Sequence, residues 1–407
     1  MPQTNHTKLV ILGGGAAGIM IAMQLAKTKY LEITLIDNKS FYEYTPALCS
    51  VLFEASDKAF EQHFNSITFD YAPYLANLNV KFILGKIASI KDGKVHLVDQ
   101  SQAIDYDYAV ICTGSSYADP WKTAAPDDGS TLDSATRFDF LRQQRQKYQA
   151  SQDILCIGGG PVGVETATEI ACRSPSKQIT LVDANENVLA SAPSHIGQYA
   201  QTIINAKPSI RSIHKEKATE KEKRGNKSIY ETDKSHTIIE ADLIYNCIGV
   251  TPNSGFLDKD WLDDKKQVVV DDTLKVRGTA NIFAVGDVNS VQEPKMFYTA
   301  HMQAVHFAKN MRRILKNVSR DEMLVPYQGA KINMVVSMGP SYAVGHVSGI
   351  NLTGWPLGTK HGSRIAAVTK YFIERITMND LGLKIPVNNL LYYTQEKGYG
   401  GLHPHSS

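Results

Sequence analysis

The feature that most constrains the fold is a pattern of strand, glycine turn, helix and strand that occurs twice in the chain. The first copy runs from Lys8 to Asp37 and the second from Asp153 to Asp183. In each copy an apolar run leads into Gly-x-Gly-x-x-Gly, a helical pattern follows, and a second apolar run ends at an aspartate. This order is typical of a unit that binds a dinucleotide. Because chance rarely duplicates it, the two units predict two bound nucleotides.

Each glycine of the pattern has its own physical role. The first permits a tight turn, the second lets the backbone approach a pyrophosphate, and the third lets the helix pack against the strand. The helix then points its free N–H groups and the positive end of its dipole at the phosphates. The six glycines are Gly13, Gly15, Gly18, Gly158, Gly160 and Gly163.

Further features follow both copies. A hairpin is expected at Asp92-Gly93, ahead of an apolar run that ends at Gly114, and a similar run ends at Gly249. A third short apolar strand ends in Gly286-Asp287. This glycine would let the backbone close on a cofactor, while the carboxylate accepts hydrogen bonds from the ribityl hydroxyls of a flavin. A flavin and a hydride donor that lie side by side predict redox chemistry.

Composition narrows the function classes. The chain has 407 residues, enough for two or three domains, and a formal net charge of only +2, which gives no global case for binding nucleic acid or an anionic membrane. Its five cysteines are scattered without a CxxC pair, which excludes a dithiol redox centre of the thioredoxin-reductase type and gives no disulfide framework or zinc site. No histidine has cysteine or carboxylate partners at ligand spacing, so we predict no metal.

The chain also lacks the usual targeting signals. It shows no secretory signal and no run of eighteen apolar residues, and Pro2 rules out N-myristoylation. We therefore expect a cytoplasmic protein, either free or peripheral on a membrane surface.

The motifs together resemble the flavoproteins with two dinucleotide-binding domains, over roughly Lys8 to Gly349. Glu293-Pro-Lys-Met, Ser337-Met-Gly and the Val-Gly-His-Val-Ser-Gly that ends at Gly349 most resemble the ferroptosis suppressor family, relatives of the apoptosis-inducing factors. Phe41-Tyr-Glu-Tyr-Thr-Pro-Ala-Leu is similar to a stretch of the type II NADH dehydrogenases. The resemblance implies FAD-dependent oxidation of NAD(P)H in a ping-pong reaction with a quinone as acceptor.

The resemblance also implies an α/β fold. Two Rossmann-like domains are expected, one inserted in the other, with a small α+β domain at the carboxyl end. The FAD-binding domain would comprise residues 1–118 and 272–324, the NAD(P)H-binding domain residues 119–271, and the carboxyl-terminal domain residues 325–407. In this last part Ile365, Val368, Phe372 and Ile376 recur at helical spacing, which predicts a helix that packs its apolar face on the core.

On this plan FAD occupies the first unit and the nicotinamide nucleotide the second. Asp183 would accept a hydrogen bond from a ribose 2′-hydroxyl and repel a 2′-phosphate, so NADH is expected over NADPH. Lys39 and Lys295 could meet the cofactor or could be ordinary surface lysines. The residues implied to bind the cofactors are Gly13, Gly15, Ala16, Ala17, Gly18, Asp37, Lys39, Thr113, Gly114, Gly158, Gly160, Gly163, Asp183, Gly249, Gly286, Asp287, Lys295 and Met296.

Two residues are candidates for catalysis. Glu165 follows the second glycine turn, and the resemblance places it near the nicotinamide and flavin rings, where it could position the nicotinamide or carry a proton; a solvated carboxylate on a helix face is the alternative. Lys370, in Val-Thr-Lys, matches a lysine near the flavin in the ferroptosis suppressor family. Tyr44, Pro46 and Leu48 would line the flavin or acceptor pocket, or simply pack within their loop.

The expected partners leave alternatives open. Residues Leu381 to Tyr393 are apolar with two tyrosines, which favours either contact with a membrane surface or docking on the core. The oligomeric state is open and includes a homodimer. One rival function is electron transfer to an iron protein, as in ferredoxin or rubredoxin reductases. The other is nucleic-acid binding, as in apoptosis-inducing factor, but the lysines between His214 and Lys227 alternate with glutamates, which indicates a solvated hairpin and no specific nucleic-acid site.

Overall fold

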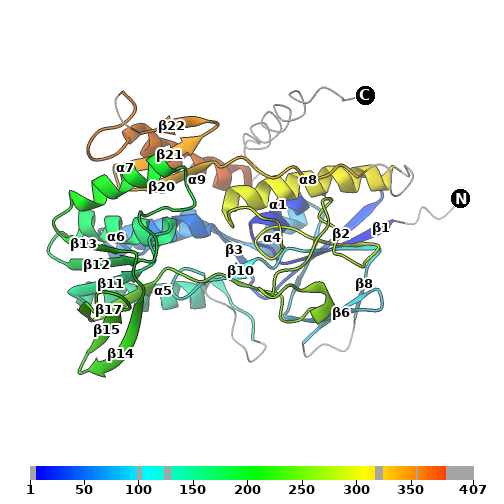
Figure 1. The fold of residues 1–407 in the computed structure, drawn as a ribbon. Helices are drawn as coiled ribbons and strands as arrows, with labels where there is room; N and C mark the ends of the chain where they lie inside the picture. Colours follow the sequence, from blue (N-terminus) through cyan, green and yellow to red (C-terminus); the bar gives the residue numbers. More distant parts are fainter. Residues whose placement is uncertain (1–5, 99–102, 123–129, 317–323, 354–355, 382–407) are drawn as a thin grey trace, which may run out of the picture.

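The computed structural model describes residues 6–98, 103–122, 130–316, 324–353 and 356–381. Its first unit is a parallel sheet with strand order β19-β9-β1-β2-β5, in which apolar runs are buried because helices and loops cover both faces. Helices α1 (Ala16–Leu25) and α8 (Phe297–Leu315) pack against each other beside this sheet (Figure 1). The strands are β1 (Thr7–Leu12), β2 (Leu31–Asp37), β5 (Lys81–Leu84), β9 (Tyr108–Ile111) and β19 (Ile282–Ala284).

The second unit repeats this arrangement with strand order β13-β12-β11-β17. Strand β11 pairs with β12 and β17 just as β1 pairs with β2 and β9, so the repeat seen in the sequence is also a repeat of topology. Its elements are β11 (Asp153–Ile157), α6 (Pro161–Arg173), β12 (Gln178–Asp183), α7 (Ser194–Asn205), β13 (Ile210–His214) and β17 (Leu243–Asn246). The fold is therefore the α/β fold with two Rossmann-like units that the sequence predicts.

Antiparallel ribbons extend from both units. The predicted hairpin at Asp92-Gly93 is confirmed: it joins β6 (Ile87–Lys91) to β7 (Lys94–Leu97), and both turn residues have positive φ, as a type I′ turn requires. The second unit carries β14 (Ala218–Arg224), β15 (Lys227–Thr232) and β16 (Ile238–Ala241). Figure 1 shows β14 and β15 projecting from the body.

Two short strands carry the chain between the units. Strand β10 (Ser115–Ser116) leaves the first unit and β18 (Thr251–Pro252) returns to it, and the two pair antiparallel. After β18 the chain packs on the first sheet, since Leu257 and Val268 belong to the same buried cluster as its strands. The chain thus rejoins the first unit before residue 271, where the sequence analysis ends the NAD(P)H-binding domain. The Rossmann-like pattern ends at β17, and no motif in the loop after it indicates where the chain passes to the other unit.

The segment between β2 and β9 covers one side of the first unit, and the linker that follows β10 contributes a long helix. Residues of this helix, α5 (Ser134–Ala150), contact α3 through Phe138, which stacks on Phe60. The remaining elements are β3 (Phe41–Glu43), the 3-10 turn Thr45–Ala47, α2 (Leu48–Val51), α3 (Asp57–Ser66), β4 (Thr68–Asp70), α4 (Tyr71–Asn77), β8 (Ile104–Asp105) and the 3-10 turn Lys259–Trp261.

The carboxyl-terminal part is a three-stranded antiparallel sheet of β20 (Met334–Ser337), β21 (Ala343–Val347) and β22 (Ile350–Leu352), covered by α9 (Arg364–Leu381). Strand β20 lies against α6 and β21 against α7, so this part rests on the second unit (Figure 1).

The helix expected there is confirmed, but its predicted orientation is wrong. Val368 and Phe372 are 53% and 55% exposed, and Ile365 is exposed as well. The inward face carries Ala366, Lys370 and Glu374 instead, because α9 meets the body through small and charged side chains.

The segment proposed to touch a membrane lies almost entirely outside the described residues, which end at Leu381. Membrane contact and the homodimer therefore stay predictions. Within the described ranges, no helix combines the length and apolar character that crossing a bilayer requires.

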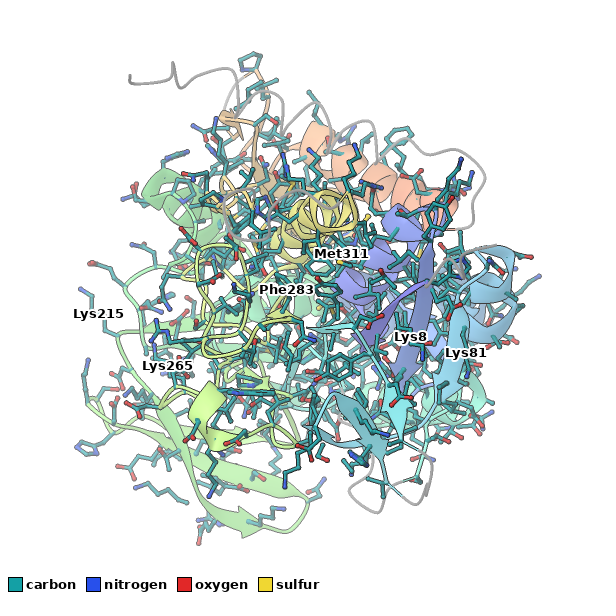
Figure 2. All side chains as sticks on the ribbon, turned by 90° about the vertical axis from the view of Figure 1, so that its right-hand side faces the viewer. Lys8, Lys81, Lys215, Lys265, Phe283 and Met311 are labelled. Atoms are coloured by element: carbon teal, nitrogen blue, oxygen red, sulfur yellow. The ribbon has the colours of Figure 1, made fainter. Side chains whose placement is uncertain are left out.

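Apolar side chains lie in the interior and charged side chains at the surface, as the hydrophobic effect requires. Figure 2 shows Phe283 of β19 and Met311 of α8 inside the protein, where they are 1% and 0% exposed, and Lys215 and Lys265 at its edge.

Candidate active site

The two glycine turns have the same geometry. Gly13 and Gly158, at the ends of β1 and β11, have φ of +101° and +108°, which other residues rarely adopt. A side chain at Gly18 or Gly163 would place its Cβ 1.8 Å from the carbonyl oxygen of Gly13 or Gly158. The turn and the close helix–strand contact expected from the sequence are therefore present in both units.

The middle glycines face open space. Gly15 and Gly160 are the residues before the first turn of α1 and α6, and a Cβ at either would meet no atom within 4 Å. A helix N-terminus with free N–H groups and room for close approach suits a phosphate. Both turns therefore fit the pyrophosphate of a dinucleotide, and Ala16 and Ala17 open the first of these helices.

The two aspartates lie beside their turns. Asp37 is buried and accepts hydrogen bonds from the N–H groups of Gly14 at 2.6 Å and Lys39 at 2.8 Å. Asp183 is buried too and accepts from the backbone N–H and the side-chain amide of Asn185, both at 2.9 Å. These contacts fix each carboxylate at the carboxyl end of its strand, where the ribose of a nucleotide would lie.

Thr113 and Gly114 are held by the returning strand. Thr113 Oγ1 donates to the carbonyl of Asn253 at 2.7 Å, and the Asn253 side chain donates back to the carbonyl of Thr113 at 2.9 Å. The N–H of Asn253 donates to the carbonyl of Gly114 at 3.0 Å. Gly249, with φ of +81°, ends the corresponding run of the second unit. The two linkers thus fasten the turn that the sequence assigns to the flavin nucleotide.

Gly286 and Asp287 approach the first unit closely. A Cβ at Gly286 would lie 3.3 Å from the Cβ of Ala17. The Asp287 carboxylate accepts from Ser115 Oγ at 2.9 Å and pairs with Lys122 Nζ at 3.3 Å. Asp287, which the sequence assigns to the flavin, therefore has a lysine and a serine as neighbours that the sequence analysis did not identify.

Lys295 and Met296 precede α8. The Lys295 ammonium donates to the carbonyls of Asn289 at 2.6 Å and Val291 at 3.2 Å, and burial lowers its pKa. The Met296 N–H donates to Thr299 Oγ1 at 3.2 Å and caps the helix. Lys295 is thus half-buried and held by two carbonyl groups, so it is not an ordinary surface lysine.

The buried centre of the site is the pair of Glu165 and Lys370. Glu165 lies on α6 and is 7% exposed; its Oε1 accepts from the N–H of Ser337 at 2.9 Å and from the Lys370 ammonium. Burial by itself would lower the pKa of Lys370, but the adjacent Glu165 carboxylate outweighs this effect and raises it. The alternative of a solvated carboxylate is therefore wrong, because α9 and β20 cover Glu165.

The predicted pocket residues lie next to the same helix. Tyr44 is 5% exposed and meets Phe297, at the start of α8, edge to face with ring centres 4.8 Å apart. Pro46 belongs to the following 3-10 turn, and Leu48 is buried in α2, which packs on α6. The structure brings this loop between the first unit and the helix that bears Glu165.

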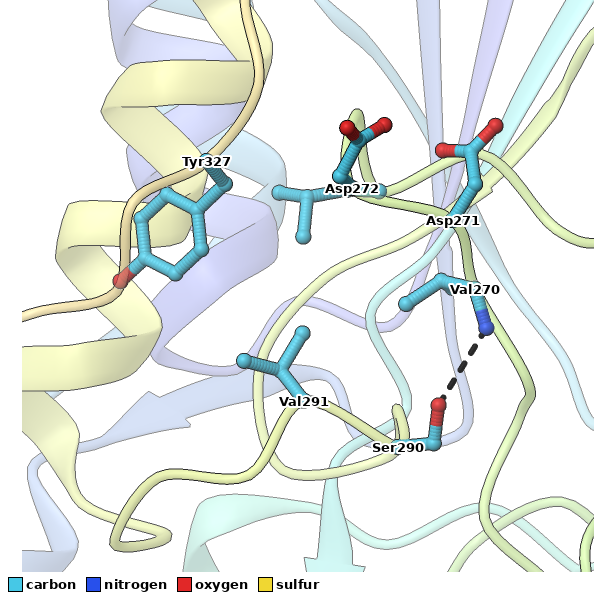
Figure 3. A pocket seen from close by; sticks show the side chains of 7 residues that line it. Val270, Asp271, Asp272, Ser290, Val291 and Tyr327 are labelled. Carbon is cyan, nitrogen blue, oxygen red and sulfur yellow. Dashed lines mark hydrogen bonds between the residues drawn. The ribbon is translucent and has the colours of Figure 1, made fainter.

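A pocket elsewhere does not suit a nucleotide. It lies behind the β18-to-β19 loop, where the Val270 N–H donates to Ser290 Oγ at 3.3 Å, and Figure 3 shows its apolar and acidic lining. Since no basic side chain lines it, phosphate would find no counter-charge there. Its lining residues are Val270, Asp271, Asp272, Leu274, Ser290, Val291 and Tyr327.

Sequence reasoning missed several residues of the site. Tyr71 donates to the carbonyl of Gly14 at 2.7 Å and supports the first turn, although it is distant from that turn in the sequence. Lys122 and Ser115 had no motif to mark them. Ser337 stood in the Ser-Met-Gly stretch noted above, so its signal was present. Among the described residues no group of three or more His, Cys, Asp or Glu side chains could hold a metal, and the expectation of no metal stays a prediction.

Comparison with known proteins agrees with this architecture. The ferroptosis suppressor protein 1 of Xenopus tropicalis is 27% identical over 357 residues, which span 85% of this chain and 90% of that protein. Oxidoreductase ptaL of Pestalotiopsis fici is 28% identical over 368 residues, spanning 86% and 94%.

Solved structures share the fold. The sulfide:quinone oxidoreductase of Aquifex aeolicus has a TM-score of 0.68 at 19% identity and covers 93% of this chain and 96% of its own. NDH2 of Plasmodium falciparum, solved with NADH, has a TM-score of 0.67 at 14% identity and covers 93% and 98%. The predicted resemblance to ferroptosis suppressors and type II NADH dehydrogenases is confirmed.

The family profile described as pyridine nucleotide-disulphide oxidoreductase matches residues 7–304, which include both glycine turns, Glu165 and Asp287. With two Rossmann-like units in the order that the profile spans, the chain belongs to the pyridine nucleotide-disulphide oxidoreductase family.

Proposed function

We propose that the protein is an FAD-dependent NADH:quinone oxidoreductase. The observation that carries this proposal is the buried pair of Glu165, on the helix that begins at the second glycine turn, with Lys370 of α9. In the proposed function this pair would serve chemistry at the nicotinamide end of the bound nucleotide. The similar solved proteins include one that acts on a quinone and one that binds NADH, which supports both substrates.

FAD, when bound, would accept a hydride from NADH and supply two electrons to the quinone. The first glycine turn, Asp37 and Asp287 would hold it, with Lys122 adding a positive charge near its phosphates or ribityl chain. The second turn and Asp183 would hold NADH.

The chain itself must then provide for charge and protons. A quinone that takes up two electrons develops negative charge on its oxygens, and a preorganised cation in a water-poor site lowers the barrier. The Lys370 ammonium meets this need because its raised pKa keeps the proton on Nζ. Glu165 Oε1, which pairs with Lys370 Nζ, holds that cation in place.

The proposed function has a direct optical test. The purified protein supplied with FAD should be yellow, its flavin band should bleach with NADH under anaerobic conditions, and a short-chain quinone should restore it. A colourless protein after FAD is supplied would contradict the cofactor assignment. A bleached band that quinone leaves unchanged would contradict the acceptor.

Asp183 predicts a preference for NADH. Replacing it with serine keeps a hydrogen-bonding group but removes the negative charge that repels a 2′-phosphate. Loss of one such charge interaction of about 1.5–3 kcal/mol should reduce the ratio of kcat/KM for NADH to that for NADPH by roughly 10- to 100-fold. Asp37→Ser is the matched control in the first unit and should alter FAD retention without altering this ratio. An NADPH preference in the unaltered enzyme would contradict the assignment.

The two rival functions differ in their support. On the β14–β15 hairpin Lys221 pairs with Glu231 at 3.0 Å and Arg224 with Glu222 at 2.5 Å, so acidic side chains partly neutralise its basic side chains, which does not favour a phosphate-binding surface. Electron transfer to an iron protein is an outcome of the optical test: a reduced flavin that a ferredoxin reoxidises faster than a quinone would favour it.

A further inference from the structure

A cationic bridge outside the proposed catalytic pair connects three helices. His63 on α3 lies between two carboxylates: its Nδ1 is 2.9 Å from Glu54, which follows α2, and its Nε2 is 3.2 Å from Glu374 on α9. All three side chains are at most 20% exposed. Both ring nitrogens therefore face a carboxylate in a partly water-excluded place.

The bridge continues to the helix that carries Glu165. Arg173 on α6 contacts Glu54 at 3.0 Å and Glu169 at 2.9 Å. Glu169 lies one helical turn after Glu165, and Glu374 lies one turn after Lys370. Helices α6 and α9 are thus joined directly by the Glu165–Lys370 pair and, one turn further along α9 and two turns further along α6, through Arg173, Glu54 and His63.

We propose that His63 is a positioning residue that fixes α9 against α3 and α6 and so keeps Lys370 paired with Glu165. The seating of α9 is a property of the fold, and only its effect on quinone reduction rests on the proposed function.

The packing of α9 explains why such a bridge matters. A helix is usually held by apolar side chains, but Val368 and Phe372 of α9 point outward and are more than half exposed. The inward face offers Ala366, Lys370 and Glu374. Apolar contacts hold the two ends of the helix, where Ala366 and Leu381 are buried, and the ion pairs of Lys370 and Glu374 hold the part between them against α6 and α3.

The charge state of His63 makes the bridge sensitive to pH. Burial by itself would lower the pKa of His63, but its hydrogen bonds to Glu374 and Glu54 outweigh this effect and raise the pKa to about 9. At neutral pH the ring is a cation that donates to both carboxylates. The stability that the charged His63 ring contributes to the folded state is fully present below the ordinary histidine pKa of about 6.5 and is lost as the pH rises through about 9. The charged groups around it are Glu54, Glu374, and behind them Arg173 and Glu169.

Amide exchange tests the positioning without any turnover. In the FAD-loaded enzyme, His63→Gln should lower the protection factors of residues 364–381 by roughly tenfold at neutral pH, since about 1.4 kcal/mol of local stability corresponds to a tenfold change. His63→Lys, which keeps a cation between the carboxylates, should restore them. Asp57→Asn is the matched control, because it breaks an ion pair of the same helix with Arg145 that does not involve α9. Equal protection in His63→Gln and Asp57→Asn would overturn the proposal.

The pH profile of quinone reduction gives the second readout. The unaltered enzyme should lose activity as the pH passes about 9. His63→Gln should be roughly 10-fold slower at neutral pH, because misplacement of a catalytic group by a fraction of an ångström has effects of this order, and its activity should not fall further near pH 9. His63→Lys should recover the rate and lose activity only at a higher pH. A fall in activity near pH 9 that is retained in His63→Gln would overturn the proposal. If protection falls as expected but no variant reduces quinone, the positioning stands and the proposed acceptor fails.

Discussion

Replacing Lys370 with methionine is expected to lower kcat/KM for quinone reduction by about 100- to 1,000-fold, the range found when a preorganised charge is removed from an active site. Methionine keeps much of the length of lysine but lacks the ammonium that would stabilise the reduced acceptor. The Glu165 carboxylate would then be buried without its cation, with only the Ser337 N–H as donor. Breaking such a pair typically costs about 3–5 kcal/mol of folding free energy.

The double variant Glu165→Gln with Lys370→Met separates the two effects. It removes both charges, so most of the lost thermal stability should return while quinone reduction stays slow. Lys360→Met, an exposed lysine ahead of α9, is the control and should behave as the unaltered enzyme. Steady-state rates and Tm measure these outcomes. A Lys370→Met enzyme with the full rate would show that the pair is structural only.

Valine at the middle glycine of either turn is expected to abolish binding of one nucleotide and leave the other. Gly15→Val should give a folded but colourless protein, whereas Gly160→Val should stay yellow and lose NADH affinity by at least about 100-fold, because the new side chain would occupy the space that the pyrophosphate needs. Both residues have φ values that valine adopts, −64° and −70°, and open space around the Cβ, so the fold itself tolerates the change.

Two further glycines bracket this prediction. Gly255→Val is the neutral control, since its Cβ also meets nothing within 4 Å but lies outside both turns. Gly18→Ala should destabilise the protein instead, because its Cβ would lie 1.8 Å from a carbonyl oxygen. Flavin absorbance per protein, NADH titration and circular dichroism distinguish these outcomes. A Gly160→Val enzyme with normal NADH affinity would remove the second nucleotide from the second turn.

Features set by local pattern could be predicted from the sequence. The two glycine turns need particular backbone angles and close contacts within a short stretch of chain. Their geometry could therefore be predicted from the positions of the glycines alone, which are Gly13, Gly18, Gly158 and Gly163. The repeated pattern also predicted that the two units share an architecture, and their central strands β1 and β11 do have corresponding parallel neighbours.

Features set by distant contacts could not. Asp287 pairs with Lys122, and Glu374 on α9 contacts His63, which lies far away in the sequence. Neither Lys122 nor His63 belongs to a motif. The orientation of α9 was misjudged for the same reason. Periodicity located an apolar stripe, but it could not reveal that the opposite face would carry Lys370 to Glu165.

The adjoining strands β10 and β18 have a consequence for engineering. Because the chain enters and leaves the second unit through one hydrogen-bonded pair, residues 117–250 form a cassette whose two ends lie next to each other. Exchanging that cassette for the equivalent piece of a relative with a different electron donor requires only two neighbouring junctions. Asn253, which is hydrogen-bonded to Thr113, stays on the recipient side, and the incoming piece should retain Lys122, which pairs with Asp287, and Phe138, which packs on Phe60.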